Sequence, residues 1–184
     1  MAALLRTLVA YVEDKPGVLN RVASLFRRRG YNIASLNVGR THDTGVSRMT
    51  IVVDTDKDGA RRLEAHLYKL VNVLLVEDIT GQPSINRDLA MIKVACSQDT
   101  RPQILGLVDV FRARVIDLAM DSIIMEITGN EEKIDRLIEV LQPYGLLEMV
   151  RTGIVAMRRG KTVPVTKEGS ASQVFEDTGV SYSV

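Results

Sequence analysis

Residues 13–33 read EDKPGVLNRVASLFRRRGYNI, and this stretch decides the fold that the sequence predicts. It opens with an acidic turn containing proline and glycine, continues with apolar residues at helical spacing, and ends in an asparagine and an isoleucine. The spacing predicts a helix over about 16–29, followed by Gly30 where a left-handed cap belongs. The expected apolar stripe of this helix comprises Val18, Leu19, Val22, Ala23 and Phe26.

Strand-like alternation flanks this helix on both sides. Leu8, Ala10 and Val12 fall on one face of a strand that ends just before the turn. The predicted elements, in order, are a strand at about 4–12, the helix, strands at about 32–40 and 47–54, a helix at about 57–70 and a strand at 72–80. This β-α-β-β-α-β order is that of a ferredoxin-like unit.

The same order of elements then repeats along the chain. LAMIKVAC predicts a strand, residues 101–113 a helix, RVIDLAM and SIIMEIT a hairpin, NEEKIDRLIEVLQPYG a helix, and LLEMVRTGIVAM one last strand. Matching elements lie about 84 positions apart before the hairpin and about 74 after it. We therefore expect an α+β fold of two tandem ferredoxin-like domains, at 1–80 and 88–157, with a linker at 81–87 and a tail at 158–184.

Composition and charge narrow the classes of function. The net charge of +1, the 4% of aromatic residues and the absence of tryptophan disfavour nucleic acid and anionic membranes as partners. A single cysteine, Cys96, excludes an internal disulfide, and the apolar runs are too short for a membrane span, so we expect a cytoplasmic protein. His42 and His66 have no ligand cluster around them in the sequence, so we expect no metal site.

The turn at 14–17 carries the chemistry of a candidate ligand site. Gly17 lets a ligand approach the backbone closely, and the N–H groups of Gly17, Val18 and Leu19 suit a carboxylate at a helix N-terminus. Asp14 supplies the opposite sign for an ammonium group. The same residues also have a structural interpretation, in which Asp14 caps the helix and Asn32 stabilises the turn before it.

A second group of residues extends this candidate site. Asn32 opens the second strand, which we expect to begin near the same end of the sheet, and its amide both donates and accepts. Val12, Val18, Leu19 and Ile33 are aliphatic and would line a slot for a small branched side chain. The set therefore predicts a site for an α-amino acid, formed by Asp14, Lys15, Pro16, Gly17, Val18, Leu19, Asn32 and Ile33.

The chain resembles a known family on two segments, DKPGVLNRVASLFRRRGYNIASLNVG at 14–39 and SRMTIVV at 47–53. It is similar to the small, regulatory subunits of acetolactate synthase (acetohydroxyacid synthase) up to about Met157, and its first copy resembles an ACT domain. The resemblance implies homodimers of side-by-side ACT domains that bind branched-chain amino acids, chiefly valine with leucine and isoleucine as related ligands, between them. The family's ligand-binding positions fall on Asp14, Gly17 and Asn32, although many relatives have asparagine where Asp14 stands.

The resemblance also implies a subunit without chemistry of its own, so no catalytic residue is expected. Such a subunit activates a separate catalytic subunit and confers feedback inhibition by valine, and thiamine diphosphate, magnesium and FAD are expected only in that partner. The second copy has SQDTRPQIL in place of the acidic turn, so no amino-acid site of this kind is expected there. The family's second domain assists dimerisation and contact with the large subunit.

Three other functions compete with this one. A free-standing ACT protein that senses amino acids for another enzyme would have the same turn. An RNA-recognition domain would need aromatic residues on its central strands, where only Tyr11 is present. An enzyme of the acylphosphatase type would need an arginine in the loop that holds Asp14 and Lys15.

Overall fold

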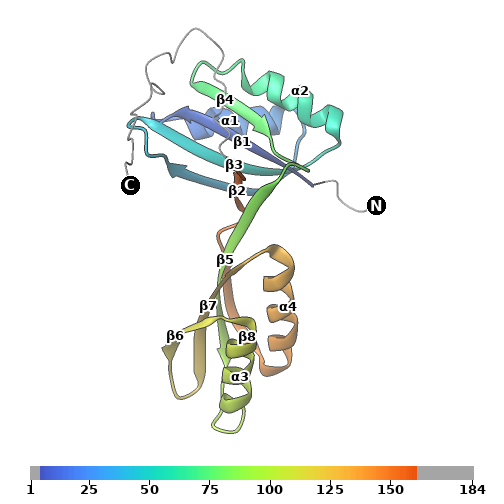
Figure 1. The fold of residues 1–184 in the computed structure, drawn as a ribbon. Coiled ribbons are helices and arrows are strands. Elements are labelled where there is room, and N and C mark those ends of the chain that lie inside the picture. The colour runs from blue at the N-terminus through green and yellow to red at the C-terminus, as the bar shows by residue number, and fades with distance from the viewer. Residues whose placement is uncertain (1–4, 161–184) are drawn as a thin grey trace, which may run out of the picture. The chain divides into compact units, whose positions relative to one another are not determined.

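The computed structural model of the chain describes residues 5–160 of the 184. Contacts divide these residues into two units (Figure 1). The first comprises residues 5–34 and 38–80, and the second Gly81–Arg159, with which Ser35–Asn37 are grouped. Most of the expected tail at 158–184 lies outside the described residues, which end at 160.

The first unit has the predicted ferredoxin-like architecture. Its strands lie in the order β2-β3-β1-β4, and β1 is antiparallel to both β3 and β4. The elements are β1 (Leu5–Glu13), α1 (Val18–Arg28), β2 (Ile33–Arg40), β3 (Val46–Asp54), α2 (Lys57–Leu67) and β4 (Val73–Asp78). The central position of β1 means that the turn after it lies beside the β2–β3 hairpin, since Glu13 is opposite Val46.

Helix α1 differs from its predicted form at its start and along its stripe. It begins at Val18, with Gly17 as its N-cap, so Pro16 lies outside the helix. The buried stripe is Val18, Val22, Leu25 and Phe26. Leu19, expected to face inward, is 44% exposed. The predicted cap at Gly30 is confirmed, because this glycine has a left-handed φ of 72°.

The second unit repeats this topology. Its strands lie in the order β6-β7-β5-β8, with β9 paired to β5. The elements are β5 (Ser84–Ala95), α3 (Arg101–Phe111), β6 (Arg114–Leu118), β7 (Ser122–Gly129), α4 (Glu131–Leu141), a short 3₁₀ helix (Gln142–Tyr144), β8 (Leu146–Arg151) and β9 (Val155–Arg158). The two strand orders correspond element by element, which confirms the predicted tandem ferredoxin-like fold.

Two boundaries in the second unit differ from the prediction. The expected last strand is divided into β8 and β9 around Gly153, whose φ is 79°. The expected linker at 81–87 becomes strand from Ser84 onward, because Ser84–Arg87 pair with Val155–Arg158. Residues 84–87 show no strand alternation of their own, so their structure depends on a partner about 70 residues away in the sequence.

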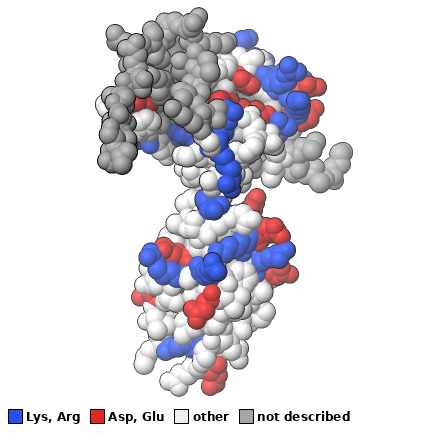
Figure 2. Space-filling view, in the orientation of Figure 1, with Lys and Arg blue, Asp and Glu red and all other residues white. Residues whose placement is uncertain are grey.

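The described residues contain no helix long and apolar enough to cross a membrane. Within the same residues, no three histidine, cysteine, aspartate or glutamate side chains gather as metal ligands would. On the face seen in Figure 2, acidic and basic side chains are interspersed over each unit. Neither unit therefore presents, on that face, the broad single-sign surface that long polyanions favour.

Candidate functional site

The local geometry of the β1–α1 turn (residues 14–17) decides whether its backbone is capped by a side chain or open to a ligand. Gly17 has a φ of 82°, a left-handed conformation that side chains disfavour, and a Cβ built there would contact nothing within 4 Å. No side chain caps α1. The interpretation of Asp14 as a helix cap is therefore wrong, and the backbone of the turn is exposed to solvent.

The backbone N–H groups at the start of α1 differ in whether they have a hydrogen-bond acceptor. Val18 N–H donates to the carbonyl oxygen of Lys15 at 3.4 Å, which closes the turn. Among the described residues, no acceptor is found for the N–H groups of Gly17 and Leu19. These two donors at a helix N-terminus are suited to an oxyanion such as a carboxylate.

The carboxylate of Asp14 has a partner that the sequence did not reveal. Arg40, at the end of β2, donates from Nε to Oδ2 of Asp14 at 3.1 Å. The arginine side chain is 86% exposed, so solvent screens this ion pair strongly. An ammonium group that binds Asp14 would therefore compete with a weakly held guanidinium.

A hollow of about 390 Å³ opens beside this ion pair. It lies between the turn and the β2–β3 hairpin and is lined by Asp14, Arg40, Thr41, His42, Asp43, Thr44, Gly45 and Val46. Acidic and basic groups both face it, which is the lining that a zwitterion requires. Its size falls in the range typical of small-molecule sites.

A polar network behind the turn holds it against the loop before β4. Asn72 donates from Nδ2 to Oε2 of Glu13 at 2.5 Å and accepts at Oδ1 from Arg21 at 2.5 Å. The hydrogen bond from Asn72, and then that from Lys15, lower the pKa of Glu13 below its ordinary value. Sequence reasoning missed Asn72, because it gives no signal beyond its place before a strand.

Asn32 and Ile33 lie at the opposite end of the sheet from the turn, so their expected proximity within one chain is wrong. Asn32 accepts from the N–H of Asp54 at 3.3 Å, and Asp54 pairs with Leu5 at the start of β1. The physical reason is that α1 returns antiparallel to β1, so β2 begins where β1 begins. At about 3.3 Å per residue, the length of β1 separates Asn32 from the turn by about 25 Å.

The aliphatic residues of the predicted slot are also divided. Val12 is 1% and Val18 4% exposed, so both belong to the core of the first unit and do not line an open cavity. Leu19 is the apolar side chain that reaches solvent beside the turn. Lys15 is exposed and pairs with Glu13 at 3.0 Å.

The second unit has no equivalent of this turn. The N-cap position of its first helix, α3, is Thr100, which has an ordinary φ of −86° and whose side chain makes no capping hydrogen bond, and Pro102 lies in the first turn of the helix. The left-handed glycine that exposes the backbone in the first unit has no counterpart there.

Comparison with known proteins agrees with this division into two related units. A family model described as an AHAS small subunit-like ACT domain matches residues 8–75, and one described as the small subunit of acetolactate synthase matches residues 87–160. The acetolactate synthase small subunit of Mycolicibacterium smegmatis is 46% identical over 154 residues, covering 84% of this chain and 91% of that protein. The chain belongs to the acetolactate synthase small-subunit family.

Two further matches are acetolactate synthase small subunits from other organisms. The acetolactate synthase small subunit of Bacillus subtilis is 45% identical over 156 residues, covering 84% of this chain and 91% of that protein. The crystal structure of the acetolactate synthase small subunit from Thermotoga maritima superimposes with a TM-score of 0.80 at 38% identity, covering 86% of this chain and 99% of that one. The resemblance on the two segments at 14–39 and 47–53 is thereby confirmed.

Proposed function

We propose that this chain is the regulatory subunit of an acetolactate synthase, which activates the catalytic subunit and makes it sensitive to valine or a related branched-chain amino acid. Membership of the small-subunit family along both units supports the regulatory role. Thiamine diphosphate, magnesium and FAD would then belong to the catalytic subunit, and the complex would act in the cytoplasm. The β1–α1 turn carries the proposal for the ligand, since it offers an acid and free backbone donors side by side.

The proposed ligand contacts follow from the charges at this turn. The ammonium group of the amino acid binds the carboxylate of Asp14 and displaces Arg40 from it. The carboxylate of the amino acid accepts from the N–H groups of Gly17 and Leu19 at the start of α1. The exposed side chain of Leu19 contacts the branched aliphatic side chain.

Asn32 enters this site only if two chains combine. β2 is an edge strand of the first unit's sheet. If two chains pair β2 against β2 around a two-fold axis, the start of one strand lies beside the end of the other. Because Arg40 at the end of β2 contacts Asp14, this pairing brings the partner's Asn32 to the β1–α1 turn. The proposed effector site is therefore shared between two protomers.

A shared site gives a physical route to regulation. An effector that spans two protomers binds one dimer geometry better than another and shifts the population by that difference in affinity. The catalytic subunit, bound to the same dimer, would respond to that shift. A ligand that contacts only one protomer would not favour one geometry of the interface between the protomers over another in this way.

Reconstitution with the cognate catalytic subunit tests this function. We expect the chain to raise the rate of acetolactate formation and valine to lower it again. Thermal denaturation of the chain alone, with valine, leucine and isoleucine, measures the effector preference by mass action. A chain that leaves the catalytic rate unchanged while valine still stabilises it would instead be an amino-acid sensor for another enzyme.

A further inference from the structure

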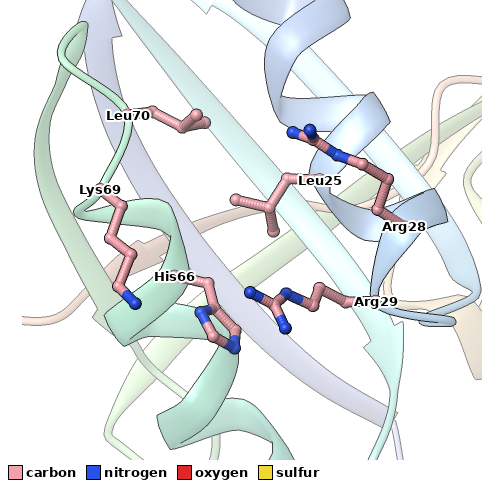
Figure 3. A pocket seen from close by; sticks show the side chains of 6 residues that line it. All are labelled: Leu25, Arg28, Arg29, His66, Lys69 and Leu70. Carbon is pink, nitrogen blue, oxygen red and sulfur yellow. The ribbon is translucent and has the colours of Figure 1, made fainter.

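A second hollow in the first unit lies on its helical side, away from the β1–α1 turn. Figure 3 shows side chains from α1 and from the end of α2 gathered around it. Its volume is about 280 Å³, and it is lined by Leu25, Arg28, Arg29, His66, Lys69 and Leu70. Because α1 begins at the turn and these residues lie at its other end, the two hollows are distinct.

All the polar side chains that line this hollow are basic. Arg28, Arg29, His66 and Lys69 contribute every titratable group, and no aspartate or glutamate lines it. Arg28 donates from Nε to the carbonyl oxygen of Ser24 at 3.3 Å. Within residues 5–160, neither Arg29 nor Lys69 forms an ion pair with an acidic side chain. The positive charge of the hollow is therefore not neutralised by the described part of the chain.

The positive charges of Arg29 and Lys69 both act on His66, which lies in the same hollow. Its Nδ1 atom is buried and has no hydrogen-bond partner among the described residues. Desolvation, followed by the nearby charges of Arg29 and Lys69, lowers the pKa of His66 below its ordinary value. A buried polar atom without a partner is uncommon, and it would gain one from a ligand or an ordered water.

The helix macrodipole explains only part of this arrangement. Cations at the last turn of a helix are favoured, and Arg28 and His66 each occupy such a position. That effect acts on each helix by itself. It does not account for the meeting of four basic side chains from two helix ends around one hollow.

We propose that this hollow binds an oxyanion of the phosphate or sulfate class. The guanidinium groups of Arg28 and Arg29 offer paired N–H donors, Lys69 adds a point charge, and the imidazole of His66 adds a donor when protonated. The hollow exceeds the volume of one such ion, and Leu25 and Leu70 line the remainder. The site thus also fits an anion that carries a small organic group, such as a phosphate ester.

Thermal denaturation with inorganic ions tests the site directly. We expect phosphate and sulfate to raise the melting temperature of the first unit in a saturable way. At equal ionic strength, the melting temperature in sodium chloride should be lower than in phosphate or sulfate. Arg29→Gln and Lys69→Gln should each abolish the difference. Arg62→Gln, which removes an exposed arginine of α2 outside the hollow, should retain it. Equal responses in the wild type and in both hollow variants would overturn the proposal.

A second measurement follows the histidine itself. The chain contains two histidines, so His42 serves as an internal reference for the NMR titration of His66. A bound anion stabilises the imidazolium, so saturating phosphate should raise the pKa of His66 relative to its value in chloride. The pKa of His42 should not change beyond the ionic-strength effect. A pKa of His66 that is the same in both salts would contradict an anion in contact with this hollow.

Discussion

Asp14 and Asn32 lie at opposite ends of one sheet, although the sequence predicts both in one ligand site. Asp14 follows the end of β1, while Asn32 bonds to Asp54 beside the start of β1. No movement within one folded unit brings them together, because β1 and β3 hold the two ends apart by a continuous ladder. A site that uses both residues therefore requires two chains.

This relationship predicts complementation between two inactive variants. Asn32→Ala removes the amide from one strand, and Gly17→Asp places a side chain and a like charge where the carboxylate of the proposed ligand would bind. Each variant alone should form a dimer that binds no valine. In a mixed dimer of the two, one of the sites receives both changes and the other receives neither.

Calorimetry of the purified mixed dimer measures this outcome. We expect about one valine site per mixed dimer, against two for the wild type and none for either parent. Gly17→Ala serves as the control for backbone strain, since it adds a side chain at the left-handed position without adding charge. A mixed dimer without any valine site would show that the ligand is held within a single chain.

The charge of Asp14 should contribute directly to effector affinity. Asp14→Asn keeps the size and the acceptor oxygen but removes the negative charge that would face the ammonium group of the proposed effector. Because a hydrogen bond to a charged group is stronger than a neutral one, we expect affinity to fall by about 1–2 kcal/mol, or roughly 5- to 30-fold. Isothermal titration with valine measures it, and an unchanged affinity would remove Asp14 from the site.

Arg40 should act as a competitor of the ammonium group. Arg40→Gln breaks an exposed ion pair, and such pairs contribute about 0.2–1 kcal/mol, so valine should bind up to roughly fivefold more tightly. Arg87→Gln, an exposed arginine of the second unit, should leave the affinity unchanged. Weaker binding by Arg40→Gln would instead indicate that its guanidinium holds the carboxylate of the effector.

The network behind the turn predicts a pH dependence of stability. The pKa of Glu13 is lowered from 4.5 in the folded chain by Asn72 and Lys15. A lowered folded pKa means stabilisation that is present above the unfolded pKa and lost as pH falls through the folded value. The melting temperature of the first unit should therefore decline below about pH 4.5, and Glu13→Gln should decline less over that range. A parallel decline in both proteins would assign the acid sensitivity to other carboxylates.

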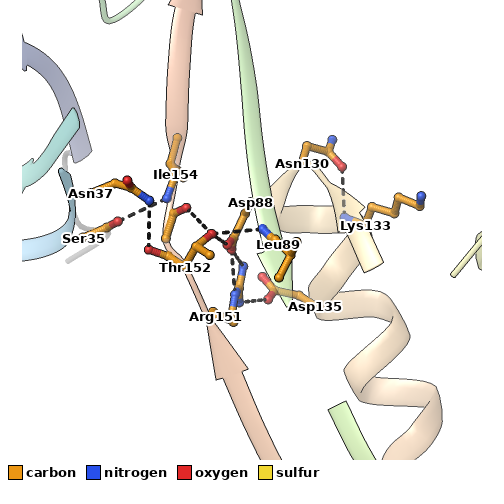
Figure 4. A network of polar contacts seen from close by, with 11 residues as sticks. Ser35, Asn37, Asp88, Leu89, Asn130, Lys133, Asp135, Arg151, Thr152 and Ile154 are labelled. Atoms are coloured by element: carbon orange, nitrogen blue, oxygen red, sulfur yellow. Dashed lines mark hydrogen bonds and ion pairs between the residues drawn. The ribbon is translucent and has the colours of Figure 1, made fainter. Parts of the chain in front are cut away.

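Arg151 and Asp88 should be the ion pair on which the second unit depends most. Asp88 is 3% exposed, and it accepts from Arg151 at 2.7 Å and from Thr152 at 3.1 Å (Figure 4). Arg151→Ala leaves a buried carboxylate without its cation, which should destabilise the second unit by about 3–5 kcal/mol.

Denaturant unfolding of the second unit measures this loss against a matched control. Arg136→Ala breaks the exposed i,i+4 pair with Glu132 on α4 and should cost less than about 0.5 kcal/mol. Arg151→Ala combined with Asp88→Asn should recover part of the loss, because the neutral amide is less costly to bury. Equal losses in Arg151→Ala and Arg136→Ala would show that burial of Asp88 is not the cause.

The amino-acid sequence by itself determined the elements, their order and their repetition. Apolar period, the glycine at position 30 and the turn chemistry at 14–17 are local signals, and each acts within a few residues of the chain. Helices α1 and α3 lie 83 residues apart and α2 and α4 lie 74 apart, close to the spacings expected from the repeat. The left-handed conformation of Gly17 is not among these predicted features, since the spacing predicts a helix that already includes residues 16 and 17.

The tertiary structure alone decided which of these residues meet. Strand order placed Asn32 far from the turn, paired Arg40 with Asp14, brought Asn72 behind Glu13 and gathered the ends of α1 and α2 around a basic hollow. It also turned residues 84–87 into strand by supplying β9 as a partner. Such contacts join residues that are far apart in the sequence. The free energy that selects them comes from packing the whole sheet, so a local sequence pattern does not predict which residues meet.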